Sequence, residues 1–226
     1  MNSSLSHQSS KVIAIDGPSA SGKGTIAERV AAILHRDYLD SGALYRLTAL
    51  YAQQSQIDWS NEAEIASLAS ALPVQFSEGK ILLHQQDVTQ AIRDEKIGMG
   101  ASQIAAFPSV RVALLQRQRD FLTERGLVAD GRDMASVVFP DAELKIFLTA
   151  SAQVRAKRRA LQLGLPTHGA SFEKILNDIE KRDAADQSRA VAPLKPVADA
   201  YTLDTSALNI QESVQKILNW YRIIKK

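Results

Sequence analysis

The apolar positions along the chain follow two periods that alternate. Short apolar runs predict strands buried on both faces of a sheet at residues 12–15, 38–39, 127–129, 144–148 and 201–203. Apolar residues at helical spacing predict helices at residues 22–34, 41–50, 110–122 and 210–224. Alternation of this kind is typical of an α/β domain with a parallel sheet, and 226 residues suffice for one such domain.

Residues 61–106 interrupt this alternation. A helix is predicted at 62–72, and three short apolar runs follow at 74–76, 80–84 and 86–88, with Glu78-Gly79 between the first two. Short strands separated by turn residues favour a small antiparallel sheet. We therefore expect an insertion here and not a further strand–helix–strand unit.

A glycine-bounded loop follows the first predicted strand. Its residues are Gly17, Pro18, Ser19, Ala20, Ser21 and Gly22, and the next helix opens with Lys23, Gly24 and Thr25. This spacing indicates a phosphate-binding loop, in which backbone amides and a helix N-terminus hold phosphate while Lys23 reaches the β- and γ-phosphates. Because the hydroxyl of Thr25 comes one place later than in the general motif, its contact with Mg2+ stays open. An ordinary glycine-rich turn is the alternative.

Polar residues stand where other predicted strands end. Asp40 ends the second strand, Ser41 is expected to be the N-cap of the next helix, and Arg46 lies beside the apolar face of that helix. Open α/β sheets bind ligands at the carboxyl ends of their strands, so these residues are candidates for a second substrate. An N-cap and a surface arginine are the alternative. Asp130 ends a further strand, where a residue that orients Mg2+ through water is expected.

A basic segment, residues 151–196, lies between the last two predicted strands. Arg155, Arg158 and Arg159 share one helix face, and as unpaired like charges they favour an anionic partner over a solvated basic face. Arg182, Asp186 and Arg189 are spaced to share a face of a second helix, although Arg182 and Asp186 alone would form an ordinary ion pair. The stretch GLPTHG at 164–169 supplies flexible joints. A mobile lid that excludes water is therefore predicted.

The composition of the chain argues against several classes of function. The 27 basic and 25 acidic residues nearly balance, which argues against binding to nucleic acid or a membrane surface. The chain has no cysteine, and its four histidines show no metal-ligand spacing. Residues 1–10 are polar and serine-rich, so we expect a disordered tail and not a signal peptide, and no apolar run is long enough for a membrane span. We expect a cytoplasmic monomer.

Seven stretches together resemble the bacterial cytidylate kinases, from about Lys11 to the C-terminus: GPSASGKGT, DSGALYR, ASQIAAFP, ADGRDM, VVFPDA, KIFL and RAVAPL. The resemblance implies a three-layer P-loop kinase domain over residues 11–226, with a nucleoside-monophosphate-binding part near 61–106 and a helical lid near 151–196. It implies residues 17–25 as the ATP site, and Lys23, Arg132, Arg155 and Arg159 as the catalytic cations. For CMP it implies Ser41, Arg46 and Arg132 at the phosphate, Arg111, Asp133 and Arg189 at the base, and Ser102, Arg182 and Asp186 at the sugar.

The implied reaction is transfer of the ATP γ-phosphoryl group to CMP, and, by resemblance alone, to dCMP. Mg2+ is expected to be held through phosphates and water near Thr25 and Asp130, with no direct protein ligand. Asp133 beside Arg111 suits the amino donor and the acceptors of cytosine, whereas uracil reverses two of these groups. A kinase for UMP, AMP or shikimate, a nucleotide-binding switch and a nucleic-acid-binding module are the alternatives. The chain lacks the N-K-x-D motif usual in GTPases.

Overall fold

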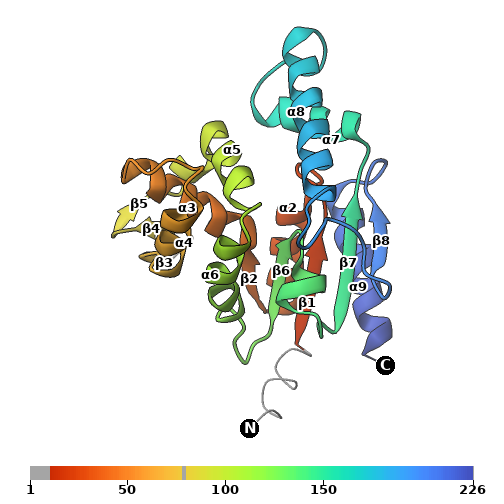
Figure 1. Cartoon of the computed structure of the whole chain (residues 1–226). Coiled ribbons are helices and arrows are strands. Elements are labelled where there is room, and N and C mark those ends of the chain that lie inside the picture. The colour runs from red at the N-terminus through yellow and green to blue at the C-terminus, as the bar shows by residue number, and fades with distance from the viewer. Residues whose placement is uncertain (1–10, 78–79, 226) are drawn as a thin grey trace. The chain divides into compact units, whose positions relative to one another are not determined.

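The computed structural model describes residues 11–77 and 80–225, so the predicted tail and the turn at Glu78-Gly79 lie outside the described residues. The chain divides into two compact units (Figure 1). The first joins the chain up to Leu39 with the chain from Phe121 onward, and the second is Asp40–Asp120. The predicted insertion at 61–106 falls within the second unit.

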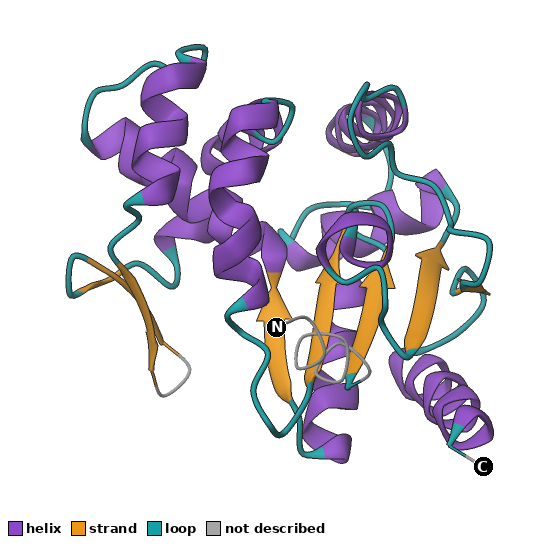
Figure 2. Cartoon of the chain, turned by 60° about the horizontal axis from the view of Figure 1, so that its bottom comes forward, coloured by secondary structure: helices purple, strands orange, loops and turns teal. Residues whose placement is uncertain are grey.

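A five-stranded sheet organises the first unit (Figure 2). Its strands are β1 (Val12–Asp16), β2 (Asp37–Asp40), β6 (Leu127–Gly131), β7 (Leu144–Thr149) and β8 (Tyr201–Asp204), in the order β2-β6-β1-β7-β8. β1 pairs in parallel with both β6 and β7, and β7 pairs in parallel with β8. The predicted parallel sheet is confirmed. Each strand directs its carboxyl end, and the loop that follows it, to the same edge.

Two helices cover this sheet through one apolar core. Ile26 and Val30 of α2 (Lys23–Leu34) pack with Ile217 and Leu218 of α9 (Ile210–Ile224) against buried strand residues such as Ile146. Asn209 and Glu212 form a reciprocal capping box at the start of α9, which satisfies two backbone amides that the helix itself leaves unpaired.

The predicted lid region consists of α7 (Ala152–Gln162) and α8 (Ala170–Gln187), which lie beyond the carboxyl ends of β1 and β7 in Figure 1. A small apolar cluster that includes Ala156, Ala160, Phe172 and Ile179 holds the two helices together. The joint between them carries Gly164 and Gly169 at φ of 66° and 77°. A five-residue π-helix, η2 (Met134–Val138), follows β6.

The second unit contains α3 (Ser41–Gln54), α4 (Glu62–Ser70), η1 (Ala91–Arg93), α5 (Glu95–Ile104) and α6 (Pro108–Arg119). It also contains the antiparallel strands β3 (Val74–Ser77), β4 (Lys80–Leu83) and β5 (Gln86–Asp87), which confirm the predicted small sheet. The predicted N-cap of α3 is wrong by one residue. Asp40 caps the helix through a 3.1 Å hydrogen bond from the Ala43 amide, and Ser41 is the first helical residue. Within the described residues, every helix is too short or too polar to cross a bilayer.

Candidate active site

The loop between β1 and α2 has a tightly constrained backbone. A Cβ on Gly17 would lie 2.2 Å from the Leu148 carbonyl oxygen, so only glycine fits there. Ala20 and Gly22 have left-handed φ angles of 58° and 90°. Lys23 Nζ folds back to donate a hydrogen bond to the Pro18 carbonyl at 3.3 Å. The lysine is therefore held over the loop that precedes it.

The N-terminus of α2 presents backbone donors next to this loop. Gly22 is the N-cap and supplies no side-chain hydrogen bond to the first turn. Ser21 is 1% exposed, and its hydroxyl has no hydrogen-bond partner among the described residues. A short glycine-bounded loop, a helix N-terminus and an adjacent lysine can together bind an anion such as phosphate.

A buried carboxylate lies beside the start of α2. Asp130 is 3% exposed, and its Oδ1 accepts a 2.7 Å hydrogen bond from the Tyr38 hydroxyl. A Cβ on Gly24 would lie 3.4 Å from that hydroxyl and 3.9 Å from Asp130 Oδ1, so Gly24 lets the helix approach closely. Asp130 is the next-to-last residue of β6, and Thr25 is exposed on α2. Residues 11–77 and 80–225 hold no group of three or more Asp, Glu or His side chains able to enclose a metal ion.

Asp16 fixes the turn that carries Arg132 and Asp133. Its carboxylate, 4% exposed at the end of β1, accepts hydrogen bonds from the amides of Met134 and Ala135, each at 2.8 Å. Burial raises the pKa of Asp16 from 3.8 to about 6, although both hydrogen bonds oppose the shift. The start of η2 is thereby tied to the strand that feeds the phosphate loop.

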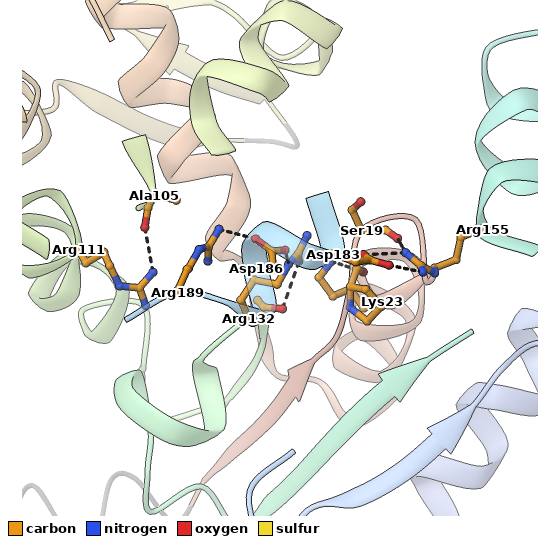
Figure 3. A network of polar contacts seen from close by, with 11 residues as sticks. Ser19, Lys23, Ala105, Arg111, Arg132, Arg155, Asp183, Asp186 and Arg189 are labelled. Carbon is orange, nitrogen blue, oxygen red and sulfur yellow. Dashed lines mark hydrogen bonds and ion pairs between the residues drawn. The ribbon is translucent and has the colours of Figure 1, made fainter. Parts of the chain in front are cut away.

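Asp186 joins two arginines (Figure 3). Its carboxylate accepts from Arg132 Nε at 2.8 Å and from Arg189 Nη2, and the residue is 2% exposed. Burial alone would raise the pKa of Asp186, but the charges of Arg132 and Arg189 outweigh it and lower the pKa. Because α8 ends at Gln187, Arg189 lies beyond the helix, and the prediction that it shares a helix face with Arg182 and Asp186 is wrong.

The arginines of α7 are not the unpaired charges that the sequence predicted. Arg155, 4% exposed, forms a two-point ion pair with Asp183 of α8, with Nη1 to Oδ1 at 3.0 Å, and donates to the Ser19 carbonyl at 3.3 Å. Arg158 donates to the Ser21 carbonyl at 3.2 Å and to Thr205. Arg159 follows on the same helix and is partly buried. Two of the three arginines therefore already contact the phosphate loop.

The second unit holds the remaining predicted residues. Arg46 Nη1 on α3 donates to the Ile92 carbonyl at 2.9 Å, and its guanidinium lies flat on Gly98 of α5, where a Cβ would come within 3.0 Å of Nη1. Arg111 on α6 is 9% exposed and donates to the Ala105 carbonyl at 3.3 Å (Figure 3). Ser41 is buried at the start of α3, and Ser102 is partly buried on α5.

The structure thus brings the predicted residues of the first unit to one edge of its sheet. The phosphate loop follows β1, the Arg132–Asp133 turn follows β6, and α7 follows β7. Sequence reasoning missed Asp16, Asp183 and the contacts of Arg158. The position of Asp16 at a strand end is the same signal that selected Asp130, whereas Asp183 carries no distinguishing pattern.

Known proteins resemble this chain over nearly its whole length. A family model described as cytidylate kinase matches residues 13–223. The cytidylate kinase of Neisseria gonorrhoeae is 65% identical over 212 residues, which cover 94% of this chain and 97% of that protein. The cytidylate kinases of Chromobacterium violaceum and Bordetella bronchiseptica are 57% and 52% identical, and each alignment covers at least 93% of both chains.

Proposed function

The chain belongs to the cytidylate kinase family, and from that premise we propose that it transfers the γ-phosphoryl group of ATP to the α-phosphate of CMP, giving CDP and ADP. One observation links the proposed reaction to particular residues of this chain. The Gly17 amide donates to the Gly131 carbonyl at 3.3 Å, and Asp16 holds the residues after Asp133. The phosphate loop and the Arg132–Asp133 turn are therefore fixed to each other at neighbouring strand ends.

This reaction needs positioning and charge neutralisation more than acid–base chemistry. The acceptor oxygen of CMP is already anionic, so the protein need supply neither a nucleophile nor a general base. Negative charge spreads over the oxygens of the transferring phosphoryl group, and fixed cations stabilise it. In our proposal Lys23, Arg132, Arg155 and Arg159 supply that charge.

The phosphate loop binds the ATP phosphates in this proposal. Residues 17–25 present backbone amides, and Lys23 exchanges the Pro18 carbonyl for phosphate oxygens when ATP binds. Arg155 makes a comparable exchange, because phosphate oxygens replace Asp183 as partners of its guanidinium. Both cations are held close to the loop beforehand.

We propose that Mg2+ binds beside Asp130. The carboxylate of Asp130 is oriented by Tyr38 and lies next to the first turn of α2, an arrangement suited to holding the water ligands of a hydrated cation. When bound, Mg2+ would neutralise charge on the nucleotide phosphates. Thr25 lies on the same turn, and we propose no direct protein ligand to the metal.

CMP is bound by nine residues in this proposal. Ser41, Arg46 and Arg132 bind its phosphate, Arg111, Asp133 and Arg189 its base, and Ser102, Arg182 and Asp186 its sugar. Each carboxylate oxygen has two lone pairs, so Asp186 can accept from a sugar hydroxyl while it keeps Arg132 and Arg189. The carboxylate of Asp133 suits the exocyclic amine of cytosine and would face an acceptor in uracil.

A parallel assay tests the function. Purified protein with ATP and Mg2+ is offered CMP, dCMP, UMP and AMP separately, and ADP formation is measured. We expect CMP to be used far better than UMP, because sites built on hydrogen bonds can reject such analogues by factors of up to about 10^4 to 10^5. We also propose that dCMP is phosphorylated. Equal use of CMP and UMP would contradict the assigned role of Asp133.

We further propose that the enzyme is a cytoplasmic monomer that does not bind nucleic acid. Light scattering at several protein concentrations tests the monomer, and a titration with a labelled oligonucleotide at low salt tests the second point. A concentration-dependent mass or salt-sensitive binding would count against these two statements.

A further inference from the structure

Arg158 occupies an unusual set of contacts for a residue of the lid region. Its guanidinium donates to the Ser21 carbonyl at 3.2 Å, the Thr205 hydroxyl at 3.1 Å, the Thr205 carbonyl at 2.6 Å and the Leu208 carbonyl at 3.4 Å. All four acceptors are neutral, and they belong to two segments outside α7. Arg158 therefore joins the first helix of the lid region to the phosphate loop and to the connection between β8 and α9.

Thr205 contacts both Arg158 and the Ser21 carbonyl. It is 2% exposed, and its hydroxyl oxygen accepts from Arg158 and lies 3.4 Å from the Ser21 carbonyl and 3.1 Å from the Thr149 carbonyl. Burial lowers the pKa of Arg158, but its ordinary pKa is so high that the guanidinium stays charged at neutral pH. Hydrogen bonds from a charged donor are stronger than those between neutral groups.

The orientation of the Ser21 carbonyl determines the direction of the Gly22 amide. A trans peptide is planar, so its C=O and the following N–H point in opposite directions. Holding the Ser21 carbonyl toward Arg158 and Thr205 turns the Gly22 amide to the other side. Gly22 has a φ of 90°, and glycine leaves this peptide free to rotate unless something outside the loop restrains it.

We propose that Arg158 and Thr205 are positioning residues that fix the Ser21–Gly22 peptide so that its N–H points at the polyphosphate of ATP. This inference rests on the proposed function only in assuming that the loop binds polyphosphate. Neither residue touches the nucleotide. Their effect is on how well the loop is formed before the nucleotide arrives, and therefore on ATP and not on CMP.

Three variants and a matched control test the proposal. Arg158→Met removes the charge and all four contacts, Arg158→Lys keeps the charge but offers a compact ammonium instead of a planar fork, and Thr205→Val removes only the hydroxyl. Lys157→Met is the control, because Lys157 is the neighbouring exposed cation on α7. Calorimetry measures the Kd of inorganic tripolyphosphate, and steady-state assays measure KM for ATP and for CMP.

We expect all three variants to weaken tripolyphosphate binding and to raise KM for ATP, by about tenfold for Arg158→Met, with KM for CMP changed by less than about twofold. Lys157→Met should bind tripolyphosphate like the wild type. Wild-type affinity in Arg158→Lys would show that charge alone matters and would overturn the proposal. Wild-type affinity in Thr205→Val would overturn the part assigned to Thr205.

Two further readouts keep the outcomes distinct. The unfolding temperature of each variant separates a folded protein with a poorly formed loop from an unfolded one, and if Arg158→Met does not fold, Arg158→Lys and Thr205→Val decide the matter. A wild-type protein that binds tripolyphosphate but phosphorylates no nucleoside monophosphate would refute the proposed function. The comparison of tripolyphosphate affinities would still test the positioning of the loop.

Discussion

Asp16 accepts a 2.8 Å hydrogen bond from the amide of Met134, across 118 positions of sequence, and so joins the end of β1 to the start of η2. The same carboxylate accepts from Ala135 at 2.8 Å. Because Arg132 and Asp133 immediately precede these amides, their placement depends on a carboxylate that is hydrogen-bonded to the two residues after them. In the proposed function, Asp16 therefore positions the turn that is expected to bind CMP.

Replacement of Asp16 by asparagine should impair CMP use more than ATP use. The variant keeps one acceptor but turns an NH2 group toward the second amide, so the Arg132–Asp133 turn loses one of its two anchors. Small misplacements of groups that bind a reacting substrate can reduce rates by about 10^2. We expect kcat/KM for CMP to fall at least about tenfold with KM for ATP nearly unchanged. Asp178→Asn, an exposed change on α8, serves as the control.

Stability should report the titration of Asp16. Its pKa in the folded protein, about 6, lies above the unfolded value of 3.8, so its contribution is fully present below pH 3.8 and is lost as the pH rises through 6. The stability advantage of wild type over Asp16→Asn should therefore shrink between pH 4 and pH 7, by up to about 3 kcal/mol. Urea unfolding at several pH values measures it, and a pH-independent difference would contradict the raised pKa.

Removal of the Asp186 carboxylate should separate Arg132 from Arg189. Asp186→Ala leaves two partly buried guanidinium groups without their shared buried acceptor, and breaking ion pairs at a buried carboxylate costs at most about 3 to 5 kcal/mol. We expect a lower unfolding temperature and a large rise in KM for CMP. In a double-mutant cycle with Arg189→Met, the two effects should be strongly non-additive. Additive effects would show that the two side chains act independently.

Lys23→Ala should reduce turnover by orders of magnitude without loss of the fold. In the structure Lys23 donates a 3.3 Å hydrogen bond to the Pro18 carbonyl, and a neutral acceptor of this kind adds little to stability, whereas the charge of Lys23 is assigned to the ATP phosphates. The assay is kcat with saturating ATP and CMP, checked against the circular dichroism of the variant. Near-normal turnover would refute the role of this lysine, and the same measurement applies to Arg132→Ala.

Gly98→Ala should impair the use of CMP without lowering the stability of the protein. The added methyl group would lie 3.0 Å from Arg46 Nη1 and force the guanidinium to move, although alanine is a better helix former than glycine by about 1 kcal/mol. We expect KM for CMP to rise while the unfolding temperature stays the same or increases. Met99→Ala is the control, since Met99 is 61% exposed on the same helix. Unchanged KM in Gly98→Ala would argue against Arg46 as a CMP ligand.

Helices and strands could be predicted from the sequence wherever the spacing of apolar residues was regular and turn or polar residues marked the ends of the element. The bounds of α9 were predicted as observed, because its apolar positions recur at helical spacing. The small antiparallel sheet was also predicted, since turn residues separate its short strands. The end of α8 was missed because nothing in the sequence around Gln187 interrupts the charged helical pattern, and Arg189 was therefore placed on the wrong element.

Partners of the charged side chains were beyond the reach of sequence patterns. Arg158 binds the Ser21 carbonyl across 137 positions, and Arg155 binds that of Ser19 across 136. Backbone carbonyls are present at every residue, so no residue type marks them as acceptors. Helical spacing could place the arginines on α7, but only the packing of α7 near the phosphate loop decides that they are paired.

The strand order has a consequence for synthesis of the protein. β1 lies between β6 and β7, and its first register pair joins Val12 to Leu127. The strand that leads into the phosphate loop therefore has no neighbour in its sheet until more than a hundred further residues have left the ribosome. Asp40–Asp120 is complete in sequence before that moment, so the compact unit in the middle of the chain can form while the apolar strand made first still waits for both of its partners.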